Sequence, residues 1–191
     1  RRAYLVEQGI RFLEIPGAGW ADNPFLAQTL LRTDRIAYTD RCVYVYRERD
    51  LREAESLAGR SPLTPLERWN DMMDVAEDVG VTDRRVLSAL ALRGLNYALI
   101  TLSGAGEDAP GVHELLERSL RRLDPDVVFH EPGISSAGRE LYSRVRGIAA
   151  PRGGKLAHLA YLAREGVYRV RTNGVAFSVR TALSRRGGRL G

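Results

Sequence analysis

The pattern of apolar and polar positions changes character near residue 60. Before that point, short stretches alternate between apolar and charged residues, which is typical of half-buried strands. The clearest are residues 10–15 and residues 42–49, the second rich in valine and tyrosine. Beyond residue 60, apolar residues recur every three or four positions, as on one side of a helix. The pattern predicts an α/β segment followed by a mainly α-helical extension, with helices predominant overall.

Two helices are also expected within the first sixty residues. Residues 2–8 have a helical pattern that Gly9 closes, because glycine readily adopts the left-handed conformation found at helix ends. Asn23 is expected to cap a second helix, with Pro24 in its first turn.

Side chains alternate along the predicted strand at residues 42–49, so four of them share one face: Val43, Val45, Arg47 and Arg49. The two valines are expected to enter a core. The two arginines are expected to project together at the far end of the strand.

The helices expected after residue 60 are marked by capping residues ahead of apolar stripes. They begin at Thr64, where Glu67 completes a capping box, at Thr82 or Asp83, near Pro110, and after Ser135. We interpret the chain as three segments: residues 1–60, the helical extension at 61–146, and a tail at 147–191. No run reaches the roughly 18–20 uninterrupted apolar residues that span a bilayer.

Composition adds a strong asymmetry of charge. Hydrophobic residues make up 44% and charged residues 28% of the 191, which indicates a soluble, globular body. Residues 144–191 contain ten arginines and one lysine against one glutamate, a net +10, which leaves −5 of the overall +5 for residues 1–143. A basic tail on an acidic body favours an anionic partner, either membrane lipid or nucleic acid.

The cysteine and histidine residues limit the kinds of site that the chain can contain. Cys42 is the only cysteine, so an internal disulfide is excluded and a reducing, cytoplasmic location is expected. The three histidines are scattered, and no metal site is expected in this chain. The chain opens without a methionine or a signal-peptide pattern, and it reads as part of something longer.

Asp22 is the candidate for chemistry in the first segment. It follows the glycine-bracketed loop at residues 17–19 and precedes the helix expected at Asn23. A carboxylate at a helix N-terminus is favoured in its ionised form, and a fixed, ionised oxygen suits a general base. The alternative is that Asp22 merely helps to cap the helix.

The other candidates also have two interpretations each. Trp20 either packs against the protein or stacks on a sugar or nucleobase. Arg47 and Arg49 either clamp a diphosphate through charge-assisted hydrogen bonds or remain solvated and paired with neighbouring acids.

Taken together, several runs resemble the C-terminal half of a family 2, GT-A type glycosyltransferase domain of the actinobacterial cell-envelope or teichoic-acid type. The resemblance covers residues 1 to about 50 and includes Trp20-Ala-Asp-Asn-Pro-Phe25, Arg35-Ile-Ala-Tyr38 and Val43-Tyr-Val-Tyr-Arg47. It implies that Asp22 is the catalytic base of an inverting transfer, and that Ala21 replaces the usual glutamate. It also implies that Trp20, Asn23, Arg47 and Arg49 bind substrate.

The same resemblance implies partners that this chain would not bind alone. They are a nucleotide-sugar donor, a glycan or polyol-phosphate acceptor, and a divalent cation, Mg²⁺ or Mn²⁺. The family holds the donor and cation in an upstream half with an Asp-x-Asp motif. Asp124-Pro-Asp126 has that spelling, but its position indicates a helix stop and a turn.

The competing hypothesis is a non-catalytic helical adaptor whose tail binds nucleic acid or an anionic membrane. Nucleic acid is disfavoured because the tail has few aromatic residues to stack on bases. For peripheral attachment to a membrane, Val175, Val179 and Leu183 are expected in the interface, with Arg180, Arg185 and Arg186 meeting lipid head groups. Homo-oligomer formation stays open.

Overall fold

The computed structural model describes residues 1–15, 20–45 and 61–149, together with positions 159, 162, 163, 166, 167, 170, 171, 174 and 175. The elements in chain order are α1 (Arg2–Glu7), α2 (Asp22–Leu31), α4 (Thr64–Val79), α5 (Arg84–Ala105), α6 (Val112–Arg121), α7 (Pro125–His130) and α8 (Ser136–Arg146).

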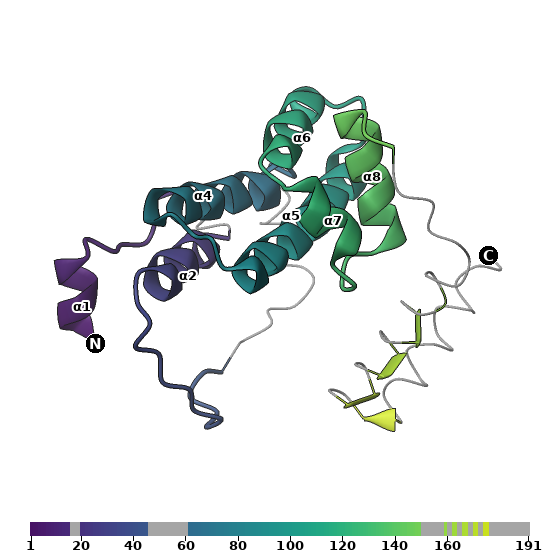
Figure 1. Ribbon diagram of the computed structural model, residues 1–191. Coiled ribbons are helices and arrows are strands. Elements are labelled where there is room, and N and C mark those ends of the chain that lie inside the picture. The colour runs from purple at the N-terminus through teal and green to yellow at the C-terminus, as the bar shows by residue number, and fades with distance from the viewer. Residues whose placement is uncertain are drawn as a thin grey trace.

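The helices form a bundle with α4 and α5 at its centre (Figure 1). Helix α2 packs along α4, while α6, α7 and α8 gather around the other part of α5. Helix α1, at the N-terminal end of the chain, is joined to α2 by a hydrogen bond of 3.1 Å from the hydroxyl of Tyr4 to the carbonyl oxygen of Thr29. Residues 32–45 leave α2 and extend away from the bundle (Figure 1).

The contact between α4 and α5 is built on Trp69. Its indole is fully buried, and its Nε1 donates a hydrogen bond to the carbonyl oxygen of Leu90 at 2.8 Å. Gly94 lies directly beneath the ring, and a Cβ there would be 2.5 Å from the nearest indole carbon. The absence of a side chain at Gly94 therefore lets the two helices approach closely enough to enclose the tryptophan.

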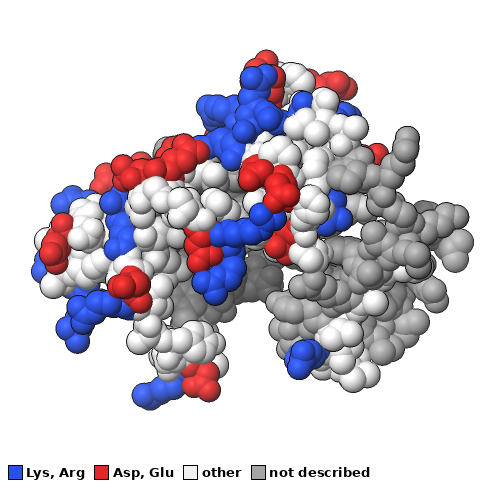
Figure 2. All heavy atoms as spheres, in the orientation of Figure 1, with Lys and Arg blue, Asp and Glu red and all other residues white. Residues whose placement is uncertain are grey.

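Arg122 ties the end of α6 to the outer face of α4. Its guanidinium bonds Asp74 at 2.8 Å, Glu77 at 2.9 Å and the carbonyl oxygen of Asn70 at 3.0 Å. Burial acts to lower the pKa of Arg122, but its bonds to Glu77 and Asp74 outweigh this effect, so the pKa lies above its ordinary value. Figure 2 shows a red surface of acidic side chains over α4.

Helix α8 is fastened to the bundle by Tyr142. This side chain is completely buried, its hydroxyl donates to the carbonyl oxygen of Leu123 at 2.9 Å, and its ring meets Phe129 edge-on. Gly147, with φ of 64°, then ends the helix in the left-handed conformation. The point from which the tail departs is thus fixed by core packing.

Most of the predicted helices are confirmed, together with the signals that begin and end them. Gly9 and Gly80 have positive φ at the ends of α1 and α4. Asp83 caps α5 by accepting from the amide of Arg85, and Ser135 caps α8 by accepting from that of Gly138. These signals are local, so they survive in the folded chain.

Other predicted caps are wrong. Thr64 lies inside α4, whose N-cap is Leu63 without a side-chain hydrogen bond. Helix α7 was not expected at all, because Asp124-Pro-Asp126 was interpreted as a stop and a turn. Asp124 instead caps α7 by accepting from the amide of Asp126, and Pro125 occupies the first helical position.

The predicted α/β fold of the first segment is wrong, although the predominance of helices is correct. Residues 10–15 and 42–45 are irregular, and no strand occurs anywhere in the described ranges. A strand needs a neighbour to pair its backbone groups, and the described part of the chain supplies none for these stretches. Val43 and Val45 are 83% and 84% exposed, so neither enters a core.

Helix α5 is long and apolar enough to cross a membrane by length and composition alone, with 22 residues and a mean hydropathy of 1.4. In the structure it is the central helix of the bundle. It packs against α4, α6, α7 and α8, and Leu90, Ala91, Leu95 and Ala98 are buried along it. A core helix of this kind meets the same criteria as a membrane span.

We expect Gly94→Ala to destabilise the fold by about 1–3 kcal/mol, because the new methyl group overlaps the indole of Trp69. The measurement is chemical denaturation followed by circular dichroism. Gly104→Ala on the same helix is the matched control, since its Cβ would meet only Pro62, at 3.3 Å, and a change below about 1 kcal/mol is expected. Equal stabilities for the two variants would contradict the close packing at Gly94.

The cap of α5 makes part of the stability depend on pH. Hydrogen bonds from the side chain and the backbone amide of Arg85 lower the pKa of Asp83 from 3.8 to about 2. A lowered pKa means that the carboxylate stabilises the folded state above pH 3.8 and that this contribution is lost as the pH falls toward 2. The difference in Tm between the parent protein and Asp83→Asn should therefore shrink over that interval. A difference that stays constant would exclude this linkage.

Candidate functional site

The candidate site surrounds the first turn of α2. Trp20 immediately precedes it and has a positive φ of 60°, an uncommon conformation for a residue with a large side chain. Its ring meets that of Tyr97 in α5 edge-on, with 5.0 Å between ring centroids, and it remains 37% exposed. The ring thus packs against α5 and stays partly exposed, and stacking on a sugar or nucleobase stays a prediction.

Asn23 anchors this turn to α5. Its side chain is buried; its Nδ2 donates to the hydroxyl of Tyr97 at 3.1 Å, and its Oδ1 accepts from Arg93 at 3.0 Å. The prediction that Asn23 caps the helix is wrong, because α2 begins at Asp22 with Ala21 as N-cap and no side-chain capping bond. The side-chain amide of Asn23 bonds to residues of α5 that lie 70 and 74 positions away in the sequence, instead of to the backbone of its own helix.

Asp22 lies on the solvent side of the same turn. Its side chain is exposed, while Ala21 and Asn23 on either side are buried. Among the residues the structure describes, its carboxylate has neither a hydrogen bond nor an ion pair. It therefore neither caps α2 with its side chain nor neutralises a neighbour, which leaves both oxygens accessible.

Ala21 is the N-cap residue that precedes the first turn of α2. The residue is only 5% exposed, so its side chain points into the protein. A glutamate in the same conformation would bury a carboxylate, which is costly without a partner. The packing of this turn thus accounts for the small residue at position 21.

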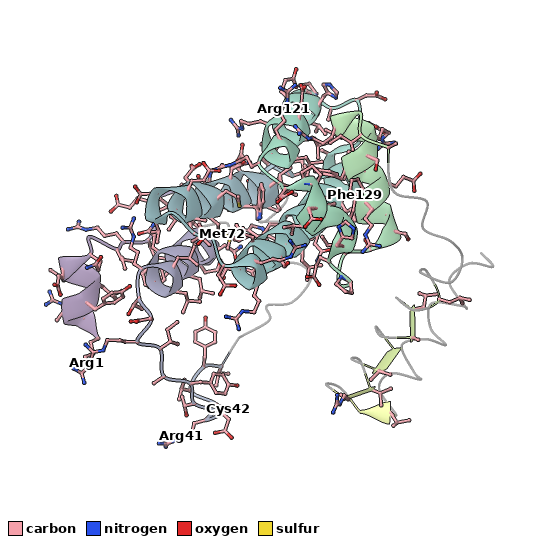
Figure 3. All side chains as sticks on the ribbon, viewed as in Figure 1. Arg1, Arg41, Cys42, Met72, Arg121 and Phe129 are labelled. Carbon is pink, nitrogen blue, oxygen red and sulfur yellow. The ribbon has the colours of Figure 1, made fainter. Side chains whose placement is uncertain are left out.

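A hollow of about 570 Å³ lies between α2 and α5, close to this turn. Its lining is mainly aliphatic, including Leu26 and Leu30 from α2, and α4 contributes Met72, which lies in the middle of the bundle in Figure 3. Arg93 and Tyr97 also line it, so the residues that hold Asn23 form one end of the hollow. Asp22 is not part of the lining.

Arg47 and Arg49, the expected diphosphate clamp, lie outside the described residues, and their role stays a prediction. The described chain approaches them only as far as Val45. Figure 3 shows Arg41 and Cys42 at the far end of this extended segment, well away from the helices. Cys42 is exposed and has a free thiol.

In the described ranges, no group of three or more histidine, cysteine or acidic side chains is arranged to hold a metal ion. The nearest approach is Asp126, whose carboxylate lies 2.8 Å from Nδ1 of His130 and 2.6 Å from Arg84. The scattered histidines thus include one, His130, that pairs with a carboxylate. A hydrogen bond and charge attraction from Arg84 lower the pKa of Asp126, as does His130 to a smaller extent. Because Arg84 belongs to α5 and Asp126 to α7, their ion pair also joins these two helices.

Sequence reasoning missed Arg93 and Tyr97. The signal that could have found them is the polar set at Arg93, Asn96 and Tyr97 within the otherwise apolar helix α5. Spacings of three and four residues put such a set on one face of a helix. That face meets α2, which only the fold reveals.

The chain was compared with models of protein families, with curated proteins and with solved structures, and none of the three comparisons found a match.

The neighbours Asp22 and Asn23 should differ sharply in their effect on stability. We expect Asn23→Ala to cost about 1–3 kcal/mol, because it removes a buried side chain and leaves partly buried groups of Arg93 and Tyr97 without their partner. Asp22→Asn should change stability by less than about 0.5 kcal/mol, because the side chain is exposed. Urea denaturation of both variants is the measurement, and a tolerated Asn23→Ala would contradict the anchoring role.

Proposed function

We propose that this chain forms the acceptor-side part of an inverting glycosyltransferase, with Asp22 as the general base. The single observation that supports it is the contrast at the first turn of α2, where an exposed carboxylate is flanked by two buried residues. The carboxylate is accessible to a substrate, while the backbone that carries it is held by the bundle. General-base catalysis needs this combination of access and fixed position.

The proposed chemistry is a proton transfer coupled to displacement. One oxygen of Asp22 takes the proton of an acceptor hydroxyl as the hydroxyl oxygen attacks the anomeric carbon of a nucleotide sugar. The bond from that carbon to the diphosphate breaks on the opposite side, so the configuration is inverted. The step requires the carboxylate in its ionised form.

Trp20 supports an acceptor that contains a sugar or polyol. Aromatic rings bind the apolar faces of sugars, and part of this ring is exposed one residue away from the Asp22–Asn23 turn. The adjoining hollow combines aliphatic walls with the polar groups of Arg93 and Asn96 at one end. Such a lining suits a ligand with both apolar and hydrogen-bonding parts.

The remaining parts of the mechanism are carried by groups outside the described residues. Arg47, and secondarily Arg49, is proposed to stabilise the departing diphosphate through charge-assisted hydrogen bonds. The divalent cation and the nucleotide are proposed to bind a nucleotide-binding half that this chain does not supply.

The test is release of nucleoside diphosphate from a panel of nucleotide sugars, with Mg²⁺ or Mn²⁺ and a polyol-phosphate or glycan acceptor. The protein assayed is this chain together with the nucleotide-binding half that the proposal requires. We expect Asp22→Asn to lower kcat by on the order of 10²–10⁴, because the amide cannot accept the proton.

Asp40→Asn is the matched control, because Asp40 is another exposed acid in the described part of the first segment. It should leave turnover within about twofold, which is the range usual for surface substitutions without a role. Retained turnover in Asp22→Asn, with a normal thermal melt, would exclude Asp22 as the base. A non-catalytic adaptor would release no nucleoside diphosphate under any of these conditions.

A further inference from the structure

The described positions of the tail are helical and exposed. Positions 159, 162, 163, 166, 167, 170 and 171 have helical conformation, and each is exposed. Four of them are large aliphatic residues, whose exposed fractions are 58% for Leu159, 49% for Leu162, 58% for Val167 and 40% for Val170. Exposed aliphatic side chains at this density call for a partner, because water is a poor environment for them.

These residues share one face of the helix. Leu159, Leu162, Ala163, Val167 and Val170 follow one another at spacings of three, one, four and three residues. At about 100° per residue, these spacings place all five within an arc of roughly 140°. We call this set the tail stripe.

The tail stripe itself is short. Gly174 has a positive φ of 79°, and its amide donates to the carbonyl oxygen of Val170 at 3.0 Å, as at a left-handed helix end. From Leu159 to Val170 a helix axis rises about 17 Å at 1.5 Å per residue. A bilayer core is about 30 Å thick, so the tail stripe covers only part of that depth.

The chain around the tail stripe is strongly basic. Residues 150–191 contain eight arginines and one lysine against a single glutamate. Arg164, Arg169 and Arg171 fall within or just beyond the stripe itself in the sequence. A short helix that combines an uncovered aliphatic face with basic neighbours has the pattern of an interfacial helix.

We propose that the tail stripe docks into the surface of an anionic phospholipid bilayer, with the helix lying in the plane of the membrane. The aliphatic face would enter the boundary between head groups and acyl chains, and the arginines would meet lipid phosphates. The charge and the apolar face together select this partner. Nucleic acid would neutralise the arginines but leave the tail stripe in water, while a second copy would cover the stripe but bring two basic tails together.

The experiment is co-sedimentation of the full chain with vesicles of phosphatidylcholine alone or with phosphatidylglycerol. We expect binding to the anionic vesicles, weakened by salt, and little binding to the neutral ones. The double variant Leu162→Glu with Val167→Glu should bind anionic vesicles on the order of tenfold or more weakly, because it places two charges in the apolar face.

The matched control is Val6→Glu with Ile100→Glu, which makes the same chemical change at two exposed aliphatic residues of the bundle, 65% and 47% exposed. It adds the same charge and should retain binding, and thermal melts of both variants check the fold. Binding that the two double variants weaken equally would overturn the proposal, since only bulk charge would matter. It would equally be overturned by tight binding to an oligonucleotide without vesicle binding, or by a concentration-dependent dimer that the stripe variant abolishes. The result is independent of transferase activity.

Discussion

The structure depends on the close approach of α4 and α5 around Trp69. A fully buried indole needs both an apolar enclosure and an acceptor for its N–H, and α5 supplies these through Gly94 and the carbonyl oxygen of Leu90. The helices from α2 onward pack against this pair: α2 against α4, and α6, α7 and α8 against α5. The position of the candidate site follows from the same contact, because α5 carries the partners of Asn23.

Polar side chains fix how the outer helices lie on that pair. Arg122 joins the end of α6 to three groups of α4, and Asn23 joins the first turn of α2 to α5. The Arg122 side chain is only 15% exposed and Asn23 only 7%, so the loss of either would remove several hydrogen bonds of a shielded group at once. Such contacts specify one arrangement of helices that apolar packing alone would leave less defined.

The sequence predicts well the ends of helices, because these depend on residues that are adjacent in the chain. The caps at Asp83 and Ser135 and the glycine ends at Gly9 and Gly80 depend on a few adjacent residues, and they are found as expected. The predicted strands are absent at the described residues 10–15 and 42–45, because alternating side chains do not supply the neighbouring strand with which the backbone must pair. Asn23 failed as a cap for a related reason, since partners on α5 compete for its amide. Asp22 is exposed although Ala21 and Asn23 on either side are buried. The sequence alone does not reveal which of these three consecutive side chains faces solvent.

The burial of Tyr142 has a consequence for the reach of the tail. Because α8 is locked to the core through this residue and ends at Gly147, the tail is tethered to a rigid point. Twelve peptide units separate Gly147 from Leu159, and even a fully extended chain of that length covers only roughly 40 Å. Any surface that captures the tail stripe thereby keeps the attachment point of the bundle within roughly 40 Å of that surface. The bundle then samples only the nearby part of that surface, at a high effective concentration.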